Sequence, residues 1–270
     1  MHVRDFTEMR EKHRAVWASG DYDKIARSTQ PVADHVVRSA HIQVGEQVLD
    51  IACGTGNTAL MARARGAVVT GLDQMPELLD IARKRAAEAG YRNIKWKEGD
   101  AENLPFADGS FDVVVSSGGL MFAADQKKVA NELARVTRRG GRVAIQAWTH
   151  DGGVGRMFKV TNIYFPLPTG VPSPFEWSDE VKVKSLLGSS FEDYQFERYD
   201  CSEYADRPEQ IVDLFIEQYR PTHRVYHALA PEMAAEFRSD LIQLYRGYVA
   251  QANGKVRRAL EYIITLSTRA

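Results

Sequence analysis

Five short apolar segments lie between residues 47 and 148, helical stretches separate most of them, and few folds accommodate this order. We expect strands at 47–52, 67–72, 94–98, 111–116 and 142–148. Helical periodicity predicts helices at 57–65, 75–89 and 126–137, the last one closed by a turn at 139–141. Because helical crossovers join neighbouring strands in parallel, the order predicts an α/β fold with a doubly wound, mostly parallel sheet.

The first expected strand runs into a glycine turn, Gly54-Thr55-Gly56, and polar residues follow the next strands. Ligands of an open parallel sheet bind beyond the carboxyl ends of its strands. The residues expected at that edge are Asp50, Ala52, Gly54, Gly56, Asp73, Gln74, Asp100, Ala101 and Ser117. Three carboxylates beside a glycine turn indicate a nucleotide-type site, in which Asp73 can accept hydrogen bonds from ribose hydroxyls.

The charge of Asp50 distinguishes between two ligands that suit such a turn. The spacing Gly54-x-Gly56-x-x-Ala59 also matches the dinucleotide pattern, in which a pyrophosphate lies against the turn and the helix N-terminus. An acid at position 50 would repel a pyrophosphate and attract the sulfonium and ammonium groups of S-adenosylmethionine. The sequence therefore favours the methyl donor. Two alternatives stay open, an NAD(P)-linked oxidoreductase and a regulatory module that binds the cofactor without turnover, and Asp50 could also tie the loop through backbone amides.

Charge and cysteine content argue against several other classes of protein. The 35 basic and 36 acidic side chains give a net charge of −1, whereas a general nucleic-acid binder would show a basic excess. Cys53 and Cys201 have neither metal-ligand spacing nor a disulfide framework, which fits a reducing compartment. There is no signal-peptide pattern, and no apolar run approaches the ~18 residues that cross a bilayer. We therefore expect a cytoplasmic protein that acts on a small molecule, without a metal, a nucleic-acid partner or membrane insertion.

The regular alternation ends after Trp148. Residues 150–178 hold Gly152, Gly153, Gly155 and four prolines among aromatic side chains and are expected to be irregular. The pattern then predicts a helix at 180–187, a strand near 191–199, helices at 208–219 and 231–249, and a last strand at 260–267. We expect cap helices in 1–40, the core in 41–150, a helical insertion or lid in 151–254, and the final core strand in 255–270. The aromatic residues of the insertion favour an apolar or aromatic methyl acceptor.

Several motifs resemble those of one enzyme family. Val48-Leu-Asp-Ile-Ala-Cys-Gly-Thr-Gly-Asn57 is similar to the first motif of class I S-adenosylmethionine-dependent methyltransferases. Gly71-Leu-Asp73, Glu98-Gly-Asp-Ala-Glu-Asn-Leu-Pro-Phe106, Phe111-Asp-Val-Val-Val-Ser116 and residues 132–143 match later motifs in the same order. Together they resemble the ubiquinone/menaquinone-biosynthesis-like (type 11) branch over residues 44–149. The resemblance implies a seven-stranded sheet whose last strand is antiparallel.

The resemblance also implies roles for individual residues. The methionine part of the cofactor would be lined by Asp50, Ala52, Gly54 and Gly56. The nucleoside part would be held by Asp73 and Gln74 at the ribose and by Asp100 and the Ala101 backbone at the adenine, with Ser117 against the cofactor past the fourth strand. The segment Trp17-Ala-Ser-Gly-Asp-Tyr22 is similar to one that folds over the methionine end, and Tyr22 is its expected contact.

Methyl transfer from a sulfonium is an in-line displacement, in which the protein mainly supplies orientation and a dry site. A general base is needed only if the nucleophile arrives protonated. His150, just past the fifth strand, is the best-placed candidate, although an ordinary solvated loop histidine is the simpler interpretation. His223 and His227 lie in the expected lid. The catalytic residue, the methyl acceptor and its accepting atom are therefore left open.

Overall fold

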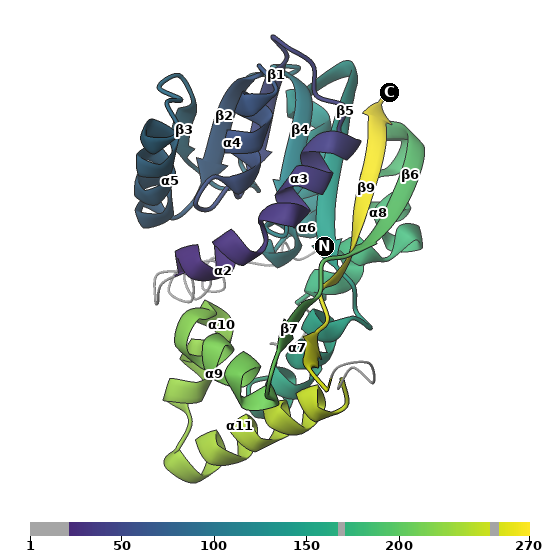
Figure 1. The fold of residues 1–270 in the computed structure, drawn as a ribbon. Coiled ribbons are helices and arrows are strands. Elements are labelled where there is room, and N and C mark those ends of the chain that lie inside the picture. Colours follow the sequence, from purple (N-terminus) through teal and green to yellow (C-terminus); the bar gives the residue numbers. More distant parts are fainter. Residues whose placement is uncertain (1–21, 167–170, 249–253) are drawn as a thin grey trace.

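The computed structural model describes residues 22–166, 171–248 and 254–270. Its centre is a seven-stranded sheet with the order β3-β2-β1-β4-β5-β9-β6 (Figure 1). The strands are β1 Gln47–Ile51, β2 Val68–Asp73, β3 Lys95–Glu98, β4 Phe111–Ser117, β5 Thr137–Trp148, β6 Phe191–Asp200 and β9 Glu261–Arg269. β1 to β5 are parallel, and β9 is antiparallel to both β5 and β6. The expected doubly wound sheet with an antiparallel last strand is confirmed.

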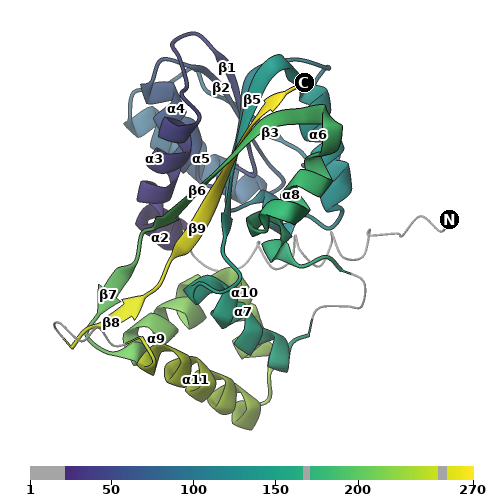
Figure 2. The ribbon, with the colours of Figure 1, turned by 90° about the vertical axis from the view of Figure 1, so that its right-hand side faces the viewer.

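Helices cover both faces of this sheet (Figure 2). One face carries α3 Gln30–Ser39, α4 Asn57–Ala64 and α5 Pro76–Glu88, and the other carries α6 Gln126–Val136 and α8 Glu180–Leu187. Alternate residues of β4 therefore enter different cores: Val113 and Val115 pack beneath α3 and α4, whereas Val114 packs with the residues of α6. Burial on both faces explains why these strands read as continuous apolar runs.

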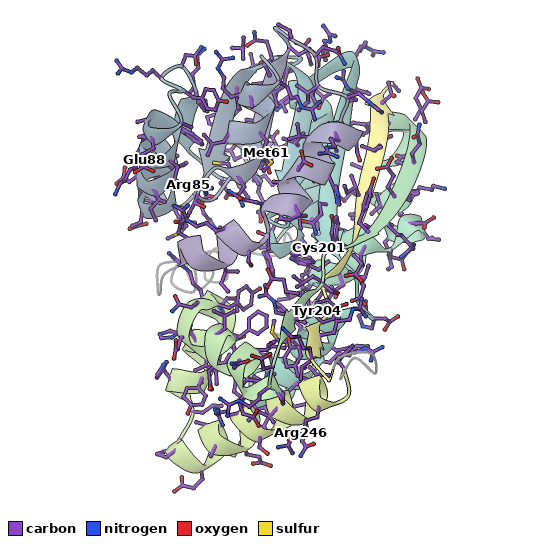
Figure 3. All side chains as sticks on the ribbon, in the orientation of Figure 1. Met61, Arg85, Glu88, Cys201, Tyr204 and Arg246 are labelled. Atoms are coloured by element: carbon purple, nitrogen blue, oxygen red, sulfur yellow. The ribbon has the colours of Figure 1, made fainter. Side chains whose placement is uncertain are left out.

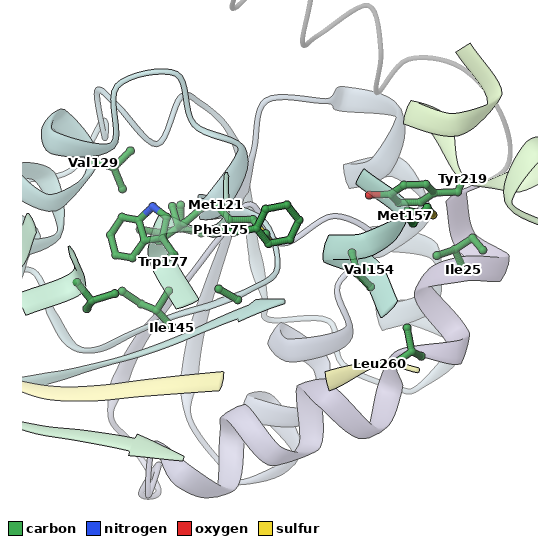
Figure 4. Packing of buried hydrophobic residues seen from close by; sticks show 14 of the residues in the cluster. Ile25, Met121, Val129, Ile145, Val154, Met157, Phe175, Trp177, Tyr219 and Leu260 are labelled. Carbon is green, nitrogen blue, oxygen red and sulfur yellow. The ribbon is translucent and has the colours of Figure 1, made fainter. Parts of the chain in front are cut away.

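A second group of elements lies beyond the carboxyl ends of the parallel strands (Figure 1). This helical layer consists of α7 Gly153–Tyr164, α9 Pro208–Gln218, α10 Arg220–Ala228 and α11 Pro231–Arg246, with the hairpin β7 Glu203–Ala205 and β8 Val256–Arg258. Short 3-10 turns occur at Leu120–Phe122, Pro174–Ser178 and Gly188–Ser190. A further helix, α2 Tyr22–Ser28, lies between the core and the helical layer, and its Ile25 packs near Met157 and Tyr219 (Figure 4).

The expectation of an irregular segment at 150–178 is wrong for α7. Its glycines are required by close packing: a Cβ on Gly153 would lie 2.3 Å from the Ala259 carbonyl oxygen, and one on Gly155 would lie 2.1 Å from the His150 carbonyl oxygen. Glycine here lets a helix begin against other backbone, because no side chain intervenes. These glycines therefore indicate close packing of two backbone segments, and the sequence analysis interpreted them wrongly as a loop.

Three other boundaries differ from the expected ones. The turn expected at 139–141 lies inside β5, where the pairing register with β4 shifts at a bulge. Residues 255–270 form two strands, because β8 pairs in the hairpin before β9 enters the core sheet. Of the two cap helices expected in 1–40, the one at 5–19 lies outside the described ranges and the one at 28–40 corresponds to α3, whereas α2 was not expected. Within the described ranges, no helix has both the length and the apolar character that crossing a bilayer requires.

Candidate active site

A cavity opens at the carboxyl ends of β1, β2, β3 and β4. This is the edge at which the order of the sheet reverses between β1 and β4, where open α/β sheets bind their ligands. Seven of the residues expected from the sequence line it, namely Ala52, Gly54, Asp73, Gln74, Asp100, Ala101 and Ser117. We call this space the strand-end cavity. Asp50 and Gly56 are absent from its lining, and the side chain of Tyr22 lies outside the described part of the chain.

The turn after β1 has a backbone that most residues avoid. Ala52, Gly54 and Gly56 have φ angles of 54°, 54° and 89°, in the left-handed region. The first turn of α4 follows at Asn57, so its free backbone amides lie beside the turn. A Cβ on Gly56 would lie 2.9 Å from the Trp96 ring, so Gly56 packs behind the cavity wall.

Asp73 is fixed at the end of β2 by the backbone around it. Its Oδ2 accepts a hydrogen bond from the Gly54 amide at 2.8 Å, and its Oδ1 accepts one from the Met75 amide at 2.9 Å. Burial raises the pKa of this carboxyl, and the amides and the charge of Arg220 act in the opposite direction. Each carboxylate oxygen can accept a further hydrogen bond, so Asp73 can receive two hydroxyl donors from the cavity.

Asp50 is buried beneath the glycine turn, with 1% of its surface exposed. Neither of its carboxylate oxygens has a hydrogen-bond partner within the described part of the chain. Burial raises its pKa well above the ordinary value, and the nearby charge of Asp73 adds to the effect, whereas the Ala59 amide opposes it. A buried acid without a hydrogen-bond partner is an unfavourable arrangement that a nearby cation would relieve.

The loop after β3 contributes a second polar wall. The Oδ1 of Asp100 accepts a hydrogen bond from the Glu102 amide at 2.9 Å, which holds the loop closed over Ala101. Glu102 was not expected from the sequence, yet it lines the cavity while its Oε1 accepts a hydrogen bond from the Asp125 amide at 2.9 Å. Its position two residues after Asp100 was the available signal, because both follow the same strand.

The apolar part of the lining was also missed by sequence reasoning. Met75, Leu78, Leu120 and Phe122 all line the cavity. The Phe122 ring lies 5.9 Å from that of Phe158 on α7, so an aromatic side chain of the helical layer backs the cavity wall. The sequence signal was the apolar run that follows Gly118-Gly119. A Cβ on Gly119 would lie 2.3 Å from the Ala52 Cβ, so this glycine lets the turns after β1 and β4 meet.

The three candidate histidines lie away from the strand-end cavity. His150 lines a second, wider cavity beyond β5 and β9, and its Nδ1 lies 3.1 Å from Asp151 Oδ1. Its side chain is 56% exposed. The rings of His223 and His227 lie 4.4 Å apart on α10, and neither residue lines either of these cavities. The structure therefore does not bring the candidate bases together with the carboxylates.

Comparison with known proteins assigns the core to a family. The family model described as "Methyltransferase domain" matches residues 49–145. An uncharacterised protein of Mycobacterium tuberculosis is 38% identical over 244 residues, which is 88% of each chain. The demethylmenaquinone methyltransferase of Thermus thermophilus is 44% identical over 102 residues, which is 37% of this chain and 46% of that protein. The chain belongs to this methyltransferase family.

Solved structures agree on the fold of the methyltransferase. The YcgJ protein of Bacillus subtilis aligns with a TM-score of 0.60 at 20% identity, covering 88% of this chain and 97% of that one. A phosphoethanolamine N-methyltransferase of Haemonchus contortus, solved in complex with S-adenosyl-L-methionine, aligns with a TM-score of 0.52 at 17% identity, covering 84% of this chain and 49% of that one.

Proposed function

We propose that this methyltransferase takes its methyl group from S-adenosylmethionine and transfers it to a small, apolar or aromatic acceptor. The observation that carries the proposal is Asp50, a buried carboxylate with no hydrogen-bond partner for either oxygen among the described residues. A pyrophosphate at the adjoining turn would add negative charge next to Asp50 and Asp73. A ligand with an ammonium and a sulfonium group would instead compensate both acids.

The remaining lining suits the nucleoside part of the same cofactor. Asp73 has lone pairs left for two ribose hydroxyls after its backbone hydrogen bonds are made. Asp100 and the Ala101 backbone, at the cavity wall after β3, would hold the adenine edge. Leu72, Met75 and Leu78 provide an apolar surface for the base. The donor complex of the related Haemonchus contortus enzyme supports this choice of cofactor.

The chain's own contribution to catalysis would be binding, orientation and the exclusion of water. When bound, the sulfonium supplies an already activated methyl group, so positioning of the acceptor accounts for much of the rate. Ser117 and Gly118 at the end of β4 would form the wall nearest the reacting groups, and the helical layer would act as a lid over the acceptor. We assign no general base, because His150 faces the second cavity.

Phe122 carries the proposal of an apolar or aromatic acceptor. It lines the strand-end cavity, and Phe158 and Phe175 continue from it as a row of rings, with centroids 5.9 and 5.4 Å apart. Such rings favour flat, apolar molecules over polymers.

Isothermal titration calorimetry with S-adenosylhomocysteine, the demethylated product, tests the cofactor assignment. The protein should bind the product with micromolar or tighter affinity and should not bind NADH. Asp112→Asn, at the amino end of β4, serves as a control variant that should bind equally well, because Asp112 contacts Arg138 far from the cavity. Binding of NADH in preference to S-adenosylhomocysteine would favour the oxidoreductase alternative and reject the proposal.

A further inference from the structure

Glu132 and Arg135 form a bidentate ion pair on α6. The Nε and Nη2 of Arg135 each donate a hydrogen bond to one carboxylate oxygen of Glu132, both at 2.7 Å, as residues three apart on a helix can do. Their side chains are 15% and 30% exposed, so water and salt screen the pair only in part. Both residues belong to the sequence motif at 132–143, and neither lines the strand-end cavity.

The pair holds the backbone of residues 104–106. The Leu104 amide donates to the Oε2 of Glu132 at 2.6 Å, and the Leu104 carbonyl oxygen accepts from the Nη2 of Arg135 at 2.8 Å. The Phe106 carbonyl oxygen accepts from the Nη1 of Arg135 at 2.6 Å. Hydrogen bonds to ionised groups are roughly twice as strong as neutral ones. Both backbone polar groups of Leu104 are therefore fixed by one ion pair.

The residues just before Leu104 form one wall of the strand-end cavity. Residues 99–102, which follow β3, all line it. This loop begins at Gly99, whose amide donates to the Asp73 carbonyl oxygen at 3.0 Å, and it ends at Leu104, whose side chain is buried in the core. The end of β2 therefore fixes the start of the loop, and the ion pair of α6 fixes its end.

A second arginine makes the same set of contacts in a different place. Arg142 donates to the two carboxylate oxygens of Glu46 at 2.9 and 2.7 Å. It also donates to the carbonyl oxygens of Ala40 and His41, at 2.6 and 2.8 Å. The side chains of Arg142 and Glu46 are 28% and 15% exposed. This pair therefore matches that of Arg135 in chemistry and burial, but it lies beside the amino end of β1 and lines neither cavity.

We propose that Glu132 and Arg135 are positioning residues for recognition of the adenine of the methyl donor. They act through the backbone of Leu104 and fix the path of the loop, so that Asp100 and the Ala101 backbone meet the adenine edge. Ligand-binding groups must be held to within roughly 0.5 Å, because hydrogen bonds weaken steeply when distance and angle are lost. This inference rests on the proposed function, because it takes the strand-end cavity as the site of the donor.

The test measures discrimination between two forms of the base. Titration calorimetry compares S-adenosylhomocysteine with S-inosylhomocysteine, in which an oxygen replaces the adenine amino group. The wild-type protein should bind the adenine form about tenfold or more tightly, because the Asp100 carboxylate accepts from the amino group and would face an oxygen in the analogue. Arg135→Met should reduce this preference to threefold or less. Glu132→Gln keeps an acceptor for the Leu104 amide and removes the charge that holds Arg135, so its preference should be intermediate.

Arg142→Met is the matched control. Chemical denaturation should show a loss of stability similar to that of Arg135→Met, whereas the preference for the adenine form should stay at the wild-type value. A merely structural role of Arg135 would not separate these two variants.

Three results overturn the proposal: the wild-type protein has no preference, Arg135→Met keeps it, or Arg142→Met loses it to the same extent. Circular dichroism shows whether each variant folds. If Arg135→Met does not fold, Glu132→Gln decides, and an unchanged preference in that variant overturns the proposal. Failure of the proposed function reads out separately, as absence of S-adenosylhomocysteine binding to the wild-type protein.

Discussion

At the scale of single residues, a buried carboxylate that has no hydrogen-bond partner among the described residues lowers the stability of the protein whenever it ionises. Asp50 is in this position, and its retained acidity makes sense if a cationic ligand compensates it. The charge of Asp50 therefore lowers the stability of the free protein, whereas the proposed binding of a cationic ligand requires it.

The substitution Asp50→Asn tests the effect of the charge on stability and its effect on ligand binding separately. It removes the charge and keeps the shape, so we expect a higher melting temperature at neutral pH, with about 2–4 °C for each kcal/mol gained. Affinity for S-adenosylhomocysteine should fall about tenfold to hundredfold, because a charge-assisted hydrogen bond is lost. Differential scanning calorimetry and titration calorimetry measure the two effects. Unchanged affinity would show that Asp50 only supports the turn.

The raised pKa of Asp50 also sets a pH dependence. A carboxyl whose pKa is higher in the folded than in the unfolded state stabilises the fold at low pH, and this contribution disappears as pH rises through the folded pKa. A bound ammonium group would lower that pKa, so binding should release a proton and strengthen as pH rises through the pKa of the free protein. Titrations in two buffers of different ionisation enthalpy count the protons released. Asp50→Asn should release fewer.

Gly119 tests the contact between two turns. Alanine there would place its Cβ 2.3 Å from the Ala52 Cβ and so would push apart the turns after β1 and β4. We expect a loss of roughly 1–3 kcal/mol in stability together with weaker S-adenosylhomocysteine binding. Gly90→Ala is the control: Gly90 has a φ of 78° and open space around it, so stability alone should fall. Equal binding by both variants would contradict the expectation.

The types of residue after each strand predict part of this site, but not all of the side chains that line it. Asp73 and Asp100 were recognisable because they are acids at or just after the ends of expected strands. Glu102 was not, because whether a polar side chain after a strand faces a cavity or the protein interior depends on the path of the loop. The role of Asp50 was inferred from its charge, but its burial behind the turn could not be seen in the sequence.

At the scale of elements, Arg85 joins α5, the glycine turn and α2 (Figure 3). Its Nη1 donates to the carbonyl and hydroxyl oxygens of Thr55, both at 2.8 Å, and its Nη2 donates to Asn57 Oδ1 at 2.7 Å. Asp23 of α2 lies 3.5 Å from the same guanidinium. One buried cation thus holds α2 against the turn that shapes the cavity.

Replacing this cation should loosen both contacts. Arg85→Met should lower stability by about 3–5 kcal/mol, since it leaves buried acceptors and the Asp23 charge without their donor, and should weaken S-adenosylhomocysteine binding. Arg83→Met, two residues earlier on the same helix, removes only an exposed pair with Asp80 and should change little. Chemical denaturation and calorimetry measure both. Equal stability and equal affinity of the two variants would show that Arg85 does not position the turn.

The elements themselves were largely predictable, and the failures have physical causes. The helix at 180–187 was placed to the residue because its apolar periodicity is clear and Asp179 caps it. α7 was missed because its glycines serve packing, and α10 because Tyr219 alone separates it from α9. The pairing of β7 with β8 joins segments about 50 residues apart, which local patterns do not encode.

At the scale of the whole molecule, Arg258 connects the helical layer to the rest. Its side chain is 4% exposed and forms an ion pair with Glu203 across the β7–β8 hairpin. The same guanidinium donates to the Ser28 hydroxyl at 3.1 Å and lies 5.5 Å above the Phe215 ring of α9. The hairpin, α9 and the end of α2 therefore share one cation.

We expect Arg258→Met to increase local opening of the helical layer while the core sheet stays folded. Hydrogen exchange should accelerate in α9 and α10 and stay unchanged in β1 and β4, because local opening follows the loss of local contacts. Arg257→Met removes a more exposed pair with Asp200 and should have a smaller effect. Equally accelerated hydrogen exchange in the core sheet would mean that the helical layer and the core open only together.

The sheet order has a consequence for how this molecule acquires its structure. Among the described strands, β6 is an edge strand that pairs with β9, whose residues come about 60–80 positions later in the chain. Until residues 261–269 are present, β6 has no ladder partner. Strands that are distant in sequence pair slowly, and their edges stay exposed until they pair. Folding of β1 to β5 can therefore run ahead, whereas β6 pairs only once β9, the strand between β5 and β6, is in place.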